Sequence, residues 1–499
     1  MSEKVYEMCM ADDVAYKQHR VSPFFRQLLA VSGIVLYMIG TGANIAYPGV
    51  LLQQLREPDS AVRLTPEHES WIASILGLAL ISGILVAPFC LQKLGRRLTN
   101  QLSTLPALGG WALLVTAKDP IALLMSRSLQ GFGMGIQAAC APVSIAEYSA
   151  PKHRGAFLAT IAFSFATGML VAHVFGTLLY WRPAAVACGS FYAISLVLIS
   201  LSPETPPFLA SKGKFNECKK SFRWLRGYDE QSKKELEILL NSQKKEVSAL
   251  KVSKLKMYSE IVKKPEFYKP TVIMMFMFVL FQISGMTVVP SYTVPMMEEV
   301  TANGIESYTS MLMVDMVRFA TAILACVVVN KLNRRTVLFL GIYISVVSLF
   351  LTSILLYLRD FGYIPEEYKW IPVLPTLMYI FGKTLGILPI PWAIAGEIFP
   401  LAYRSLGSGI SGMFLSLMFF VVVKTAPTSF RQIGVKGTFC VYGISIAVCG
   451  VFLFFLLPET KGKTLYEIEC HFKGIKNDTG ETKGTEKDRM LELEKVEEG

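Results

Sequence analysis

Two charged residues, Asp315 and Arg318, stand in the middle of an otherwise apolar segment, 307–330. Their spacing of three puts them on one face of a helix, where they can form an ion pair. Charged groups at such depth are costly and often mark a functional site. The pair is either a self-neutralised structural element, or its guanidinium donates to the hydroxyls of a solute or to an anion. His173 and Lys383 also lie deep in apolar segments, where a neighbouring carbonyl is their commoner partner.

Polar side chains also interrupt the apolar segment 270–290, which carries Gln282, Ser284 and Thr287 and is followed by Tyr292. Polar groups inside an apolar helix need partners, and a polyol offers many hydroxyls. Gln282 and Ser284 are two residues apart, so they point to different sides of a helix. Only one of the two can face a solute well.

A pair of prolines, Pro389 and Pro391, precedes Trp392 within the apolar segment 371–395. Two prolines so close together remove backbone donors and kink or break a helix. Such a break is tolerated in a membrane only where it is buried or lines a cavity. The feature is either a passive kink, or a hinge that carries Trp392 as a stacking surface for the solute.

Further charged residues lie at the ends of apolar segments, and two of them repeat a spacing. Glu147 stands seven residues before Arg154, and Glu397 stands seven before Arg404. Basic residues at such positions set membrane orientation and snorkel to the interface, but this role has no use for a glutamate. The repeated glutamates favour inter-helix ion pairs that close one side of the membrane and break when the halves rock. The full set is Arg96, Arg97, Glu147, Arg154, Arg334, Arg335, Glu397 and Arg404.

Apolar segments of about 20 residues, long enough to span a bilayer, must position these side chains. Hydrophobic residues make up 52% of the chain and charged residues only 17%, which is too apolar for a soluble protein. The segments do not alternate as barrel strands do, so the fold class is an all-α membrane protein. Twelve segments qualify: 27–51, 70–90, 99–117, 120–143, 155–180, 184–202, 270–290, 307–330, 336–357, 371–395, 405–425 and 437–457.

The basic residues set the orientation and exclude nucleic acid as a partner. The net charge is +11, but Lys and Arg cluster in particular short connections, as in membrane proteins. This bias predicts both termini in the cytosol. The cysteines do not pair in an external loop, so we expect no structural disulfide, and no cleaved signal peptide is evident.

Short motifs recur in order along the chain and divide it into two halves. LGRRLT around Arg96 recurs as LNRRTV around Arg334, and PETPPFL at 203 recurs as PETKGKT at 458. Two six-helix halves related in this way place a solute between them near the midplane. The expected units are a cytosolic segment 1–26, a first half 27–202, a cytosolic linker of short amphipathic helices 203–269, a second half 270–457 and a cytosolic tail 458–499.

Several of these motifs together resemble one family. SRSLQGFGMGIQAA, AEYSAPKHRGAF, PETPPFL, QISG, NRR, PIPWAIAGEIFP and PETKGKTLYEIE occur in this order. They resemble the sugar porters of the major facilitator superfamily, and within them the insect facilitative trehalose and hexose transporters. The resemblance implies the major facilitator fold, with twelve helices in two six-helix pseudo-repeats. It also implies a cytosolic gate on the eight charged residues above, and a solute site on Gln282, Thr287, Arg318 and Trp392.

The chain departs from that family at several positions where its members have polar or acidic groups. The departures are Gln92 and Asn330 near the gate, and Ala162, Phe281, Thr287, Arg318, Thr384, Leu415 and Ser416 in the site. Thr41 stands near the place where proton-coupled members carry an aspartate in helix 1. The lack of a helix-1 carboxylate favours facilitated diffusion, while Asp315 keeps coupling open.

The sequence therefore predicts a plasma-membrane uniporter for a sugar such as trehalose or a hexose, working by alternating access. We expect no enzymatic chemistry, no metal and no cofactor, and nothing resembles an ATP site. Two alternatives stay open. One is a carrier of a non-sugar, possibly anionic, solute, which Arg318 suggests. The other is a non-transporting nutrient sensor on the same fold. The oligomeric state is open too.

Overall fold

The computed structural model describes residues 22–57, 60, 62–246, 264–302, 306–400, 404–461, 463 and 465–473, and this part is almost entirely helical. Nine helical stretches in it are long and apolar enough to cross a membrane. α4 and α5 pack among them, and α19 joins two helices at Gly434, where φ is 69°. The described part thus contains the twelve membrane-length helices that the sequence predicts.

The first half and the linker form helices that begin at recognisable signals. Proline occupies the first turn of most of them, where its missing N–H costs nothing. In α3 and α5 the side chains of Thr65 and Asp119 also accept from a backbone N–H group of the first turn. The helices are α2 (Pro23–Leu55), α3 (Pro66–Lys93), α4 (Arg96–Thr116), α5 (Pro120–Tyr148), α6 (Pro151–Leu178), α7 (Trp181–Leu201), α8 (Pro206–Ser211), α9 (Phe215–Arg226) and α10 (Glu230–Glu246).

The second half is more interrupted. Its elements are α12 (Pro265–Ile283), α13 (Val288–Ser291), α14 (Thr293–Thr301), α15 (Ser307–Lys331), α16 (Arg334–Asp360), the short η1 (Glu366–Tyr368), α17 (Val373–Gly382), the π-helical η2 (Lys383–Ile387), α18 (Pro389–Glu397), α19 (Arg404–Leu456) and α20 (Leu465–Lys473).

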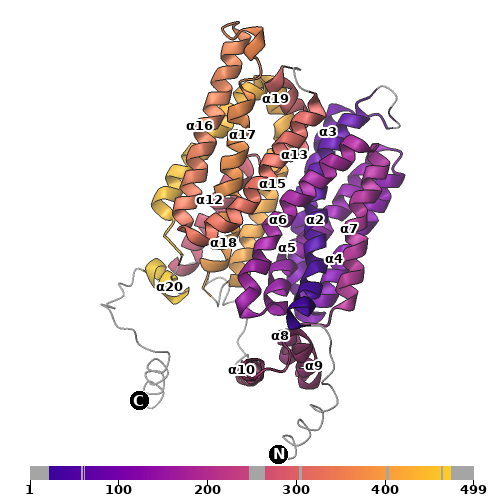
Figure 1. Cartoon of the computed structure of the whole chain (residues 1–499), viewed down its shortest axis with the longest axis vertical. Helices are drawn as coiled ribbons and strands as arrows, with labels where there is room; N and C mark the ends of the chain where they lie inside the picture. The colour runs from indigo at the N-terminus through magenta and orange to yellow at the C-terminus, as the bar shows by residue number, and fades with distance from the viewer. Residues whose placement is uncertain are drawn as a thin grey trace, which may run out of the picture.

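The long helices lie side by side along the long axis of the molecule (Figure 1). α8, α9, α10 and α20 lie at one end of the bundle, which we call the linker end, and the connection between α16 and α17 projects at the other, the far end (Figure 1). Buried apolar side chains form one large cluster centred on the first half and another within the second.

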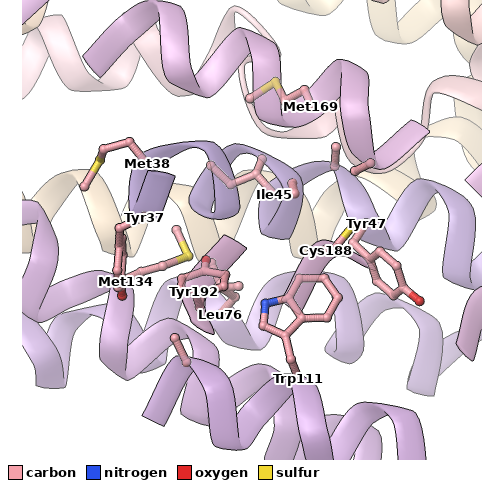
Figure 2. Packing of buried hydrophobic residues seen from close by; sticks show 14 of the residues in the cluster. Tyr37, Met38, Ile45, Tyr47, Leu76, Trp111, Met134, Met169, Cys188 and Tyr192 are labelled. Atoms are coloured by element: carbon pink, nitrogen blue, oxygen red, sulfur yellow. The ribbon is translucent and has the colours of Figure 1, made fainter. Parts of the chain in front are cut away.

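Close approach of backbones holds the first half together. A Cβ atom at Gly135 of α5 would lie 2.2 Å from the carbonyl oxygen of Leu80 on α3, and one at Gly168 of α6 would lie 1.9 Å from that of Ile39 on α2. Small residues give helices in lipid this intimate contact. Between the backbones lie edge-to-face aromatic pairs such as Tyr47 on Trp111, whose ring centroids are 4.9 Å apart (Figure 2).

Two of the predicted spanning helices differ from expectation. The segment 270–290 is not one helix, because it breaks after Ile283 and resumes at Val288. The segment 371–395 deviates from α-helix at Lys383–Ile387, ahead of Pro389 rather than at the two prolines.

Labelling at the two ends of the bundle tests the predicted orientation. Lys212 is exposed at the linker end, and Tyr363 is 76% exposed at the far end. In intact cells, a membrane-impermeant maleimide should label Tyr363→Cys, and it should label Lys212→Cys only after permeabilisation. Cys218 is a poor reporter because it is buried, so its silence carries no information. Labelling of Lys212→Cys without permeabilisation would show that the linker end faces outward and would contradict the predicted orientation.

Candidate functional site

The seventh membrane helix breaks inside the bundle, between α12 and α13. Gly285 permits the break, because its φ of 70° lies in the left-handed region that favours glycine. A Cβ atom at this position would also lie only 2.6 Å from the hydroxyl oxygen of Tyr379. A broken helix leaves backbone carbonyls without helical partners, and a bilayer offers no water to replace them. The break therefore depends on donors from elsewhere in the protein.

Tyr379 and Lys383, one turn apart on the tenth membrane helix, supply those donors. The Tyr379 hydroxyl donates to the carbonyl oxygen of Ser284 at 2.5 Å, and the Lys383 ammonium donates to that of Gly285 at 3.0 Å. Lys383 also donates to the Tyr379 hydroxyl at 3.3 Å, and both side chains are buried. The interpretation of Lys383 as the partner of a neighbouring carbonyl is confirmed.

The π-helical turn η2 lies directly at this contact. It begins at Lys383 and ends at Ile387, just before Pro389. A π-helical turn widens the helix locally and is frequent at functional sites. Gly386 lets this widened turn approach α16, because a Cβ atom there would lie 2.4 Å from the carbonyl oxygen of Val337.

Gln282 and Thr287, two of the residues predicted to bind solute, flank the break and contact each other. The Thr287 hydroxyl donates to Oε1 of Gln282 at 2.8 Å, and both side chains are buried. Ser284 instead donates to the carbonyl oxygen of Phe281 at 2.8 Å, within its own turn. The break thus holds an amide and a hydroxyl in one fixed arrangement.

Arg318, the third predicted residue, belongs to a buried charged cluster that joins the two halves. The Asp315 carboxylate contacts both the Arg318 guanidinium on its own helix and the His173 imidazole on α6. Nε2 of His173 lies 3.2 Å from the carbonyl oxygen of Pro290, on the far side of the helix-7 break. Arg318 is also near enough to Lys383 for their charges to interact. The cluster therefore surrounds the break.

Trp392, the fourth predicted residue, lies on α18 beside the site rather than in the buried cluster. Its ring contacts those of Phe278 and Phe281, with centroids 5.7 and 6.2 Å away, and 45% of its surface is exposed. Phe281 immediately precedes Gln282. The structure thus brings Gln282, Thr287 and Arg318 to the helix-7 break, and Trp392 adjoins them through Phe281.

At the linker end, each half contains one ion pair between corresponding residues. Arg96 pairs with Glu147 at 2.7 Å in the first half, and Arg334 pairs with Glu397 at 3.2 Å in the second. The second arginine of each motif hydrogen-bonds a carbonyl instead: Arg97 contacts that of Ser200, and Arg335 contacts that of Phe454. These contacts all lie within one half, and none joins the halves.

Arg154 and Arg404, the other two predicted gate residues, do not take part in these pairs as described. Arg154 is exposed and forms no ion pair with any residue that the structure describes. The side chain of Arg404 lies outside the described residues.

Two glutamates that were singled out only as parts of a repeated motif cap helices at the linker end. Glu204 accepts from the backbone N–H groups of Arg96 and Arg97 at 3.0 and 3.1 Å. Glu459 accepts from those of Arg334 and Arg335, both at 3.1 Å. A carboxylate at a helix N-terminus accepts from backbone N–H groups that have no partner within the helix, and its negative charge interacts favourably with the helix dipole. The PET motifs therefore fix the starts of α4 and α16.

The two capping carboxyls differ in their pKa. Burial raises the pKa of Glu204 above its ordinary value, although backbone N–H groups oppose this. Burial would raise that of Glu459 too, but hydrogen bonds from four backbone N–H groups outweigh it, and the pKa is lowered. The cap of the second half is therefore the one that stays ionised more readily as the pH falls.

Several contacts between the halves lie toward the far end. The Ser291 hydroxyl, just after the break, donates to the carbonyl oxygen of Ile45 on α2 at 3.2 Å. Lys424 of α19 donates to the hydroxyl of Ser70, near the start of α3, at 2.7 Å. Close approach of α3 and α19 continues at Gly77, where a Cβ atom would lie 2.7 Å from the backbone nitrogen of Phe420.

Sequence reasoning missed a further buried basic residue, Arg127 of α5. Its guanidinium donates to the Asn44 side chain on α2 and to Oε1 of Gln130 at 2.8 Å. No carboxylate contacts Arg127 among the described residues. The sequence signal that could have identified it is an arginine within the apolar segment 120–143. Asn44, rather than Thr41, is the helix-1 side chain that faces it.

Proteins of known sequence and structure resemble this chain over nearly its full length. A protein from Apis mellifera ligustica named "Facilitated trehalose transporter Tret1" is 30% identical over 471 residues, which cover 93% of this chain and 92% of that protein. A protein of the same name from Drosophila virilis is 30% identical over 454 residues, but there the chain spans only 49% of the relative.

Solved structures share the fold. The structure described as "Inward open conformation of the xylose transporter XylE from E. coli" superimposes with a TM-score of 0.70 at 18% identity, over 90% of this chain and 100% of that one. XylE bound to 6-bromo-6-deoxy-D-glucose gives 0.69 at 19% identity, over 90% and 99%. These likenesses show the twelve-helix major facilitator fold.

A family model described as "Sugar (and other) transporter" matches residues 28–472, which include both halves, the linker and the helix-7 break. The chain therefore belongs to the sugar (and other) transporter family of the major facilitator fold.

Proposed function

We propose that the protein carries a sugar across a membrane by facilitated diffusion, through a single site between its two halves. The helix-7 break carries the proposal, because it holds Gln282 and Thr287 as a buried amide and hydroxyl. A sugar offers hydroxyls around its edge, which need fixed donors and acceptors of this kind. Family membership and relatives named as facilitated trehalose transporters support the sugar class.

Alternating access is supported by where the halves touch. Toward the far end they meet through close backbone contacts and the hydrogen bond of Ser291 to Ile45, whereas the linker-end ion pairs stay within each half. We infer a state that is closed at the far end. In the opposite state, the halves approach at the linker end. Arg154 of the first half then becomes a partner for Glu397 of the second, and Arg404 of the second half becomes one for Glu147 of the first. The eight charged residues then act as the gate.

Uncoupled transport is supported by the partner of Arg127. The helix-1 group beside it is the neutral Asn44, and the whole of α2 contains no aspartate or glutamate. Proton coupling needs a group that is charged in one state and neutral in the other. Asp315 is held between His173 and Arg318 in this state.

We place the protein in the plasma membrane, with the linker end toward the cytosol.

Uptake by proteoliposomes tests the proposed function directly. We expect a labelled sugar, from a panel that includes trehalose and hexoses, to equilibrate down its gradient. A protonophore should leave the initial rate unchanged, because no proton moves with the sugar. Accumulation against the sugar gradient, driven by external acid, would show coupling instead. A protein that inserts correctly and transports no sugar of the panel would support the sensor or the non-sugar carrier.

The Gln282→Ala substitution tests the site. Losing a hydrogen bond to a neutral ligand costs about 0.5–1.5 kcal/mol, so the apparent affinity should fall roughly twofold to tenfold. Ser284→Ala is the matched control, since that hydroxyl is bonded within its own turn and should leave affinity unchanged. Equal effects of the two substitutions, or none from either, would move the site away from the break.

The Glu397→Gln and Glu147→Gln substitutions test the gate. Each removes one charge from an ion pair at the linker end, which shifts the balance between conformations. We expect severalfold slower uptake with normal insertion. Glu366→Gln breaks an exposed pair with Lys369 at the far end and should change nothing. Unchanged uptake in both gate variants would mean that these residues only set the orientation of the protein in the membrane.

A further inference from the structure

Basic side chains outnumber carboxylates around the helix-7 break. Arg318 and Lys383 are near enough for their charges to interact, and Asp315 is the carboxylate that the structure places among them. Each oxygen of Asp315 contacts one basic group, Oδ1 that of Arg318 and Oδ2 that of His173. Among the described residues, Lys383 hydrogen-bonds only the neutral oxygen atoms of Gly285 and Tyr379. The buried cluster therefore offers one carboxylate to three basic side chains.

The Arg318 guanidinium is also incompletely bonded. Its Nη1 contacts Asp315, whereas its Nη2 is buried and has no hydrogen-bond partner among the described residues. Only 5% of the residue is exposed. The hydroxyl oxygen of Thr384, next to Lys383, is likewise buried without a partner. A buried charge that lacks its hydrogen bonds is expensive, so a site that keeps one is prepared for a ligand that completes it.

The chemistry of these groups selects the missing partner. A guanidinium presents its N–H groups in a planar fork that matches a carboxylate, and an ammonium adds a point charge. A sugar hydroxyl satisfies a donor but brings no charge to pair with the guanidinium. A carboxylate that reaches Nη2 of Arg318, beside Lys383, completes the hydrogen bonds of the guanidinium and adds a second acidic group to the cluster.

We propose that the transported solute is an acidic sugar, a polyhydroxylated carboxylate such as a hexuronate, whose carboxylate binds Arg318 beside Lys383. Its hydroxyls then meet Gln282 and Thr287. This inference rests on the proposed function, because it specifies the sugar that the same site accepts. It gives Arg318 the role of a specificity residue that contacts the substrate.

Three sugars that differ only at C6 test the proposal on the full chain in proteoliposomes. D-glucuronate carries a carboxylate there, D-glucuronamide an uncharged amide of nearly the same shape, and D-glucose a hydroxymethyl group. At concentrations below saturation, we expect glucuronate to enter about tenfold faster or more, since hydrogen bonds to charged groups are the stronger ones. Arg318→Gln should remove the preference for glucuronate over glucuronamide. Lys369→Gln, which removes an exposed cation at the far end, should preserve it.

A second measurement covers the case in which Arg318→Gln fails to fold. Glucuronate should then raise the melting temperature of the unaltered protein in detergent, while glucuronamide at the same concentration should not. If glucose or trehalose enters faster than glucuronate, the acidic-sugar inference is wrong while the proposed sugar carrier stands. If Lys369→Gln loses the preference as fully as Arg318→Gln, general charge attraction accounts for it and the inference fails. If none of these sugars enters, the proposed function fails as well.

Discussion

The break in the seventh membrane helix depends on one requirement, that every backbone carbonyl inside the bundle must meet a donor. The carbonyl oxygen of Ser284 accepts from Tyr379, and that of Gly285 accepts from Lys383 as well as from the backbone N–H of Val289. Both side-chain donors come from the tenth membrane helix, so a change of shape at the break also changes the contacts of helix 10. The π-helical turn that starts at Lys383 belongs to the same arrangement, because it positions the ammonium at the break.

The same requirement explains why polar side chains gather where they do. Once helix 7 is open, Gln282 and Thr287 are free of the regular helical face and bond to each other across the break. His173 reaches across from the first half to the carbonyl oxygen of Pro290 and to Asp315. The contacts between the halves are therefore polar at the break. They differ from the apolar, glycine-mediated packing that holds each half together as a unit.

The sequence predicted the helices well and the contacts between them poorly, for different physical reasons. Span length and hydropathy are local properties, so the twelve membrane helices could be located without a structure. The break at Gly285 could not, because a glycine in an apolar run is as often a packing residue as a point of positive φ. The Glu-to-Arg spacing of seven drew attention to Glu147 and Glu397, but their partners are Arg96 and Arg334.

Distance along the chain explains the larger omissions in the predicted site. His173 and Asp315 are 142 residues apart, and no periodicity links them. The sequence placed Gln282, Thr287 and Arg318 in one site, but did so through a family resemblance rather than through spacing. Arg127 carried the same signal as Arg318, a cation in an apolar segment, and its partner Asn44 lies 83 residues away.

The two halves differ in how continuous their helices are. Both halves share the framework at the linker end, in which an arginine–glutamate pair and a capping glutamate fix the third helix of each half. Away from this framework they diverge. α2 and α5 are single helices, although each contains one proline in its interior, whereas their counterparts in the second half are interrupted at Gly285 and at Lys383–Ile387. Interruptions lower the cost of local bending, because fewer helical hydrogen bonds must break. In the proposed mechanism, the first half serves as a rigid wall. The second half contributes most of the proposed solute-binding groups, and local rearrangement at its two interruptions would move them.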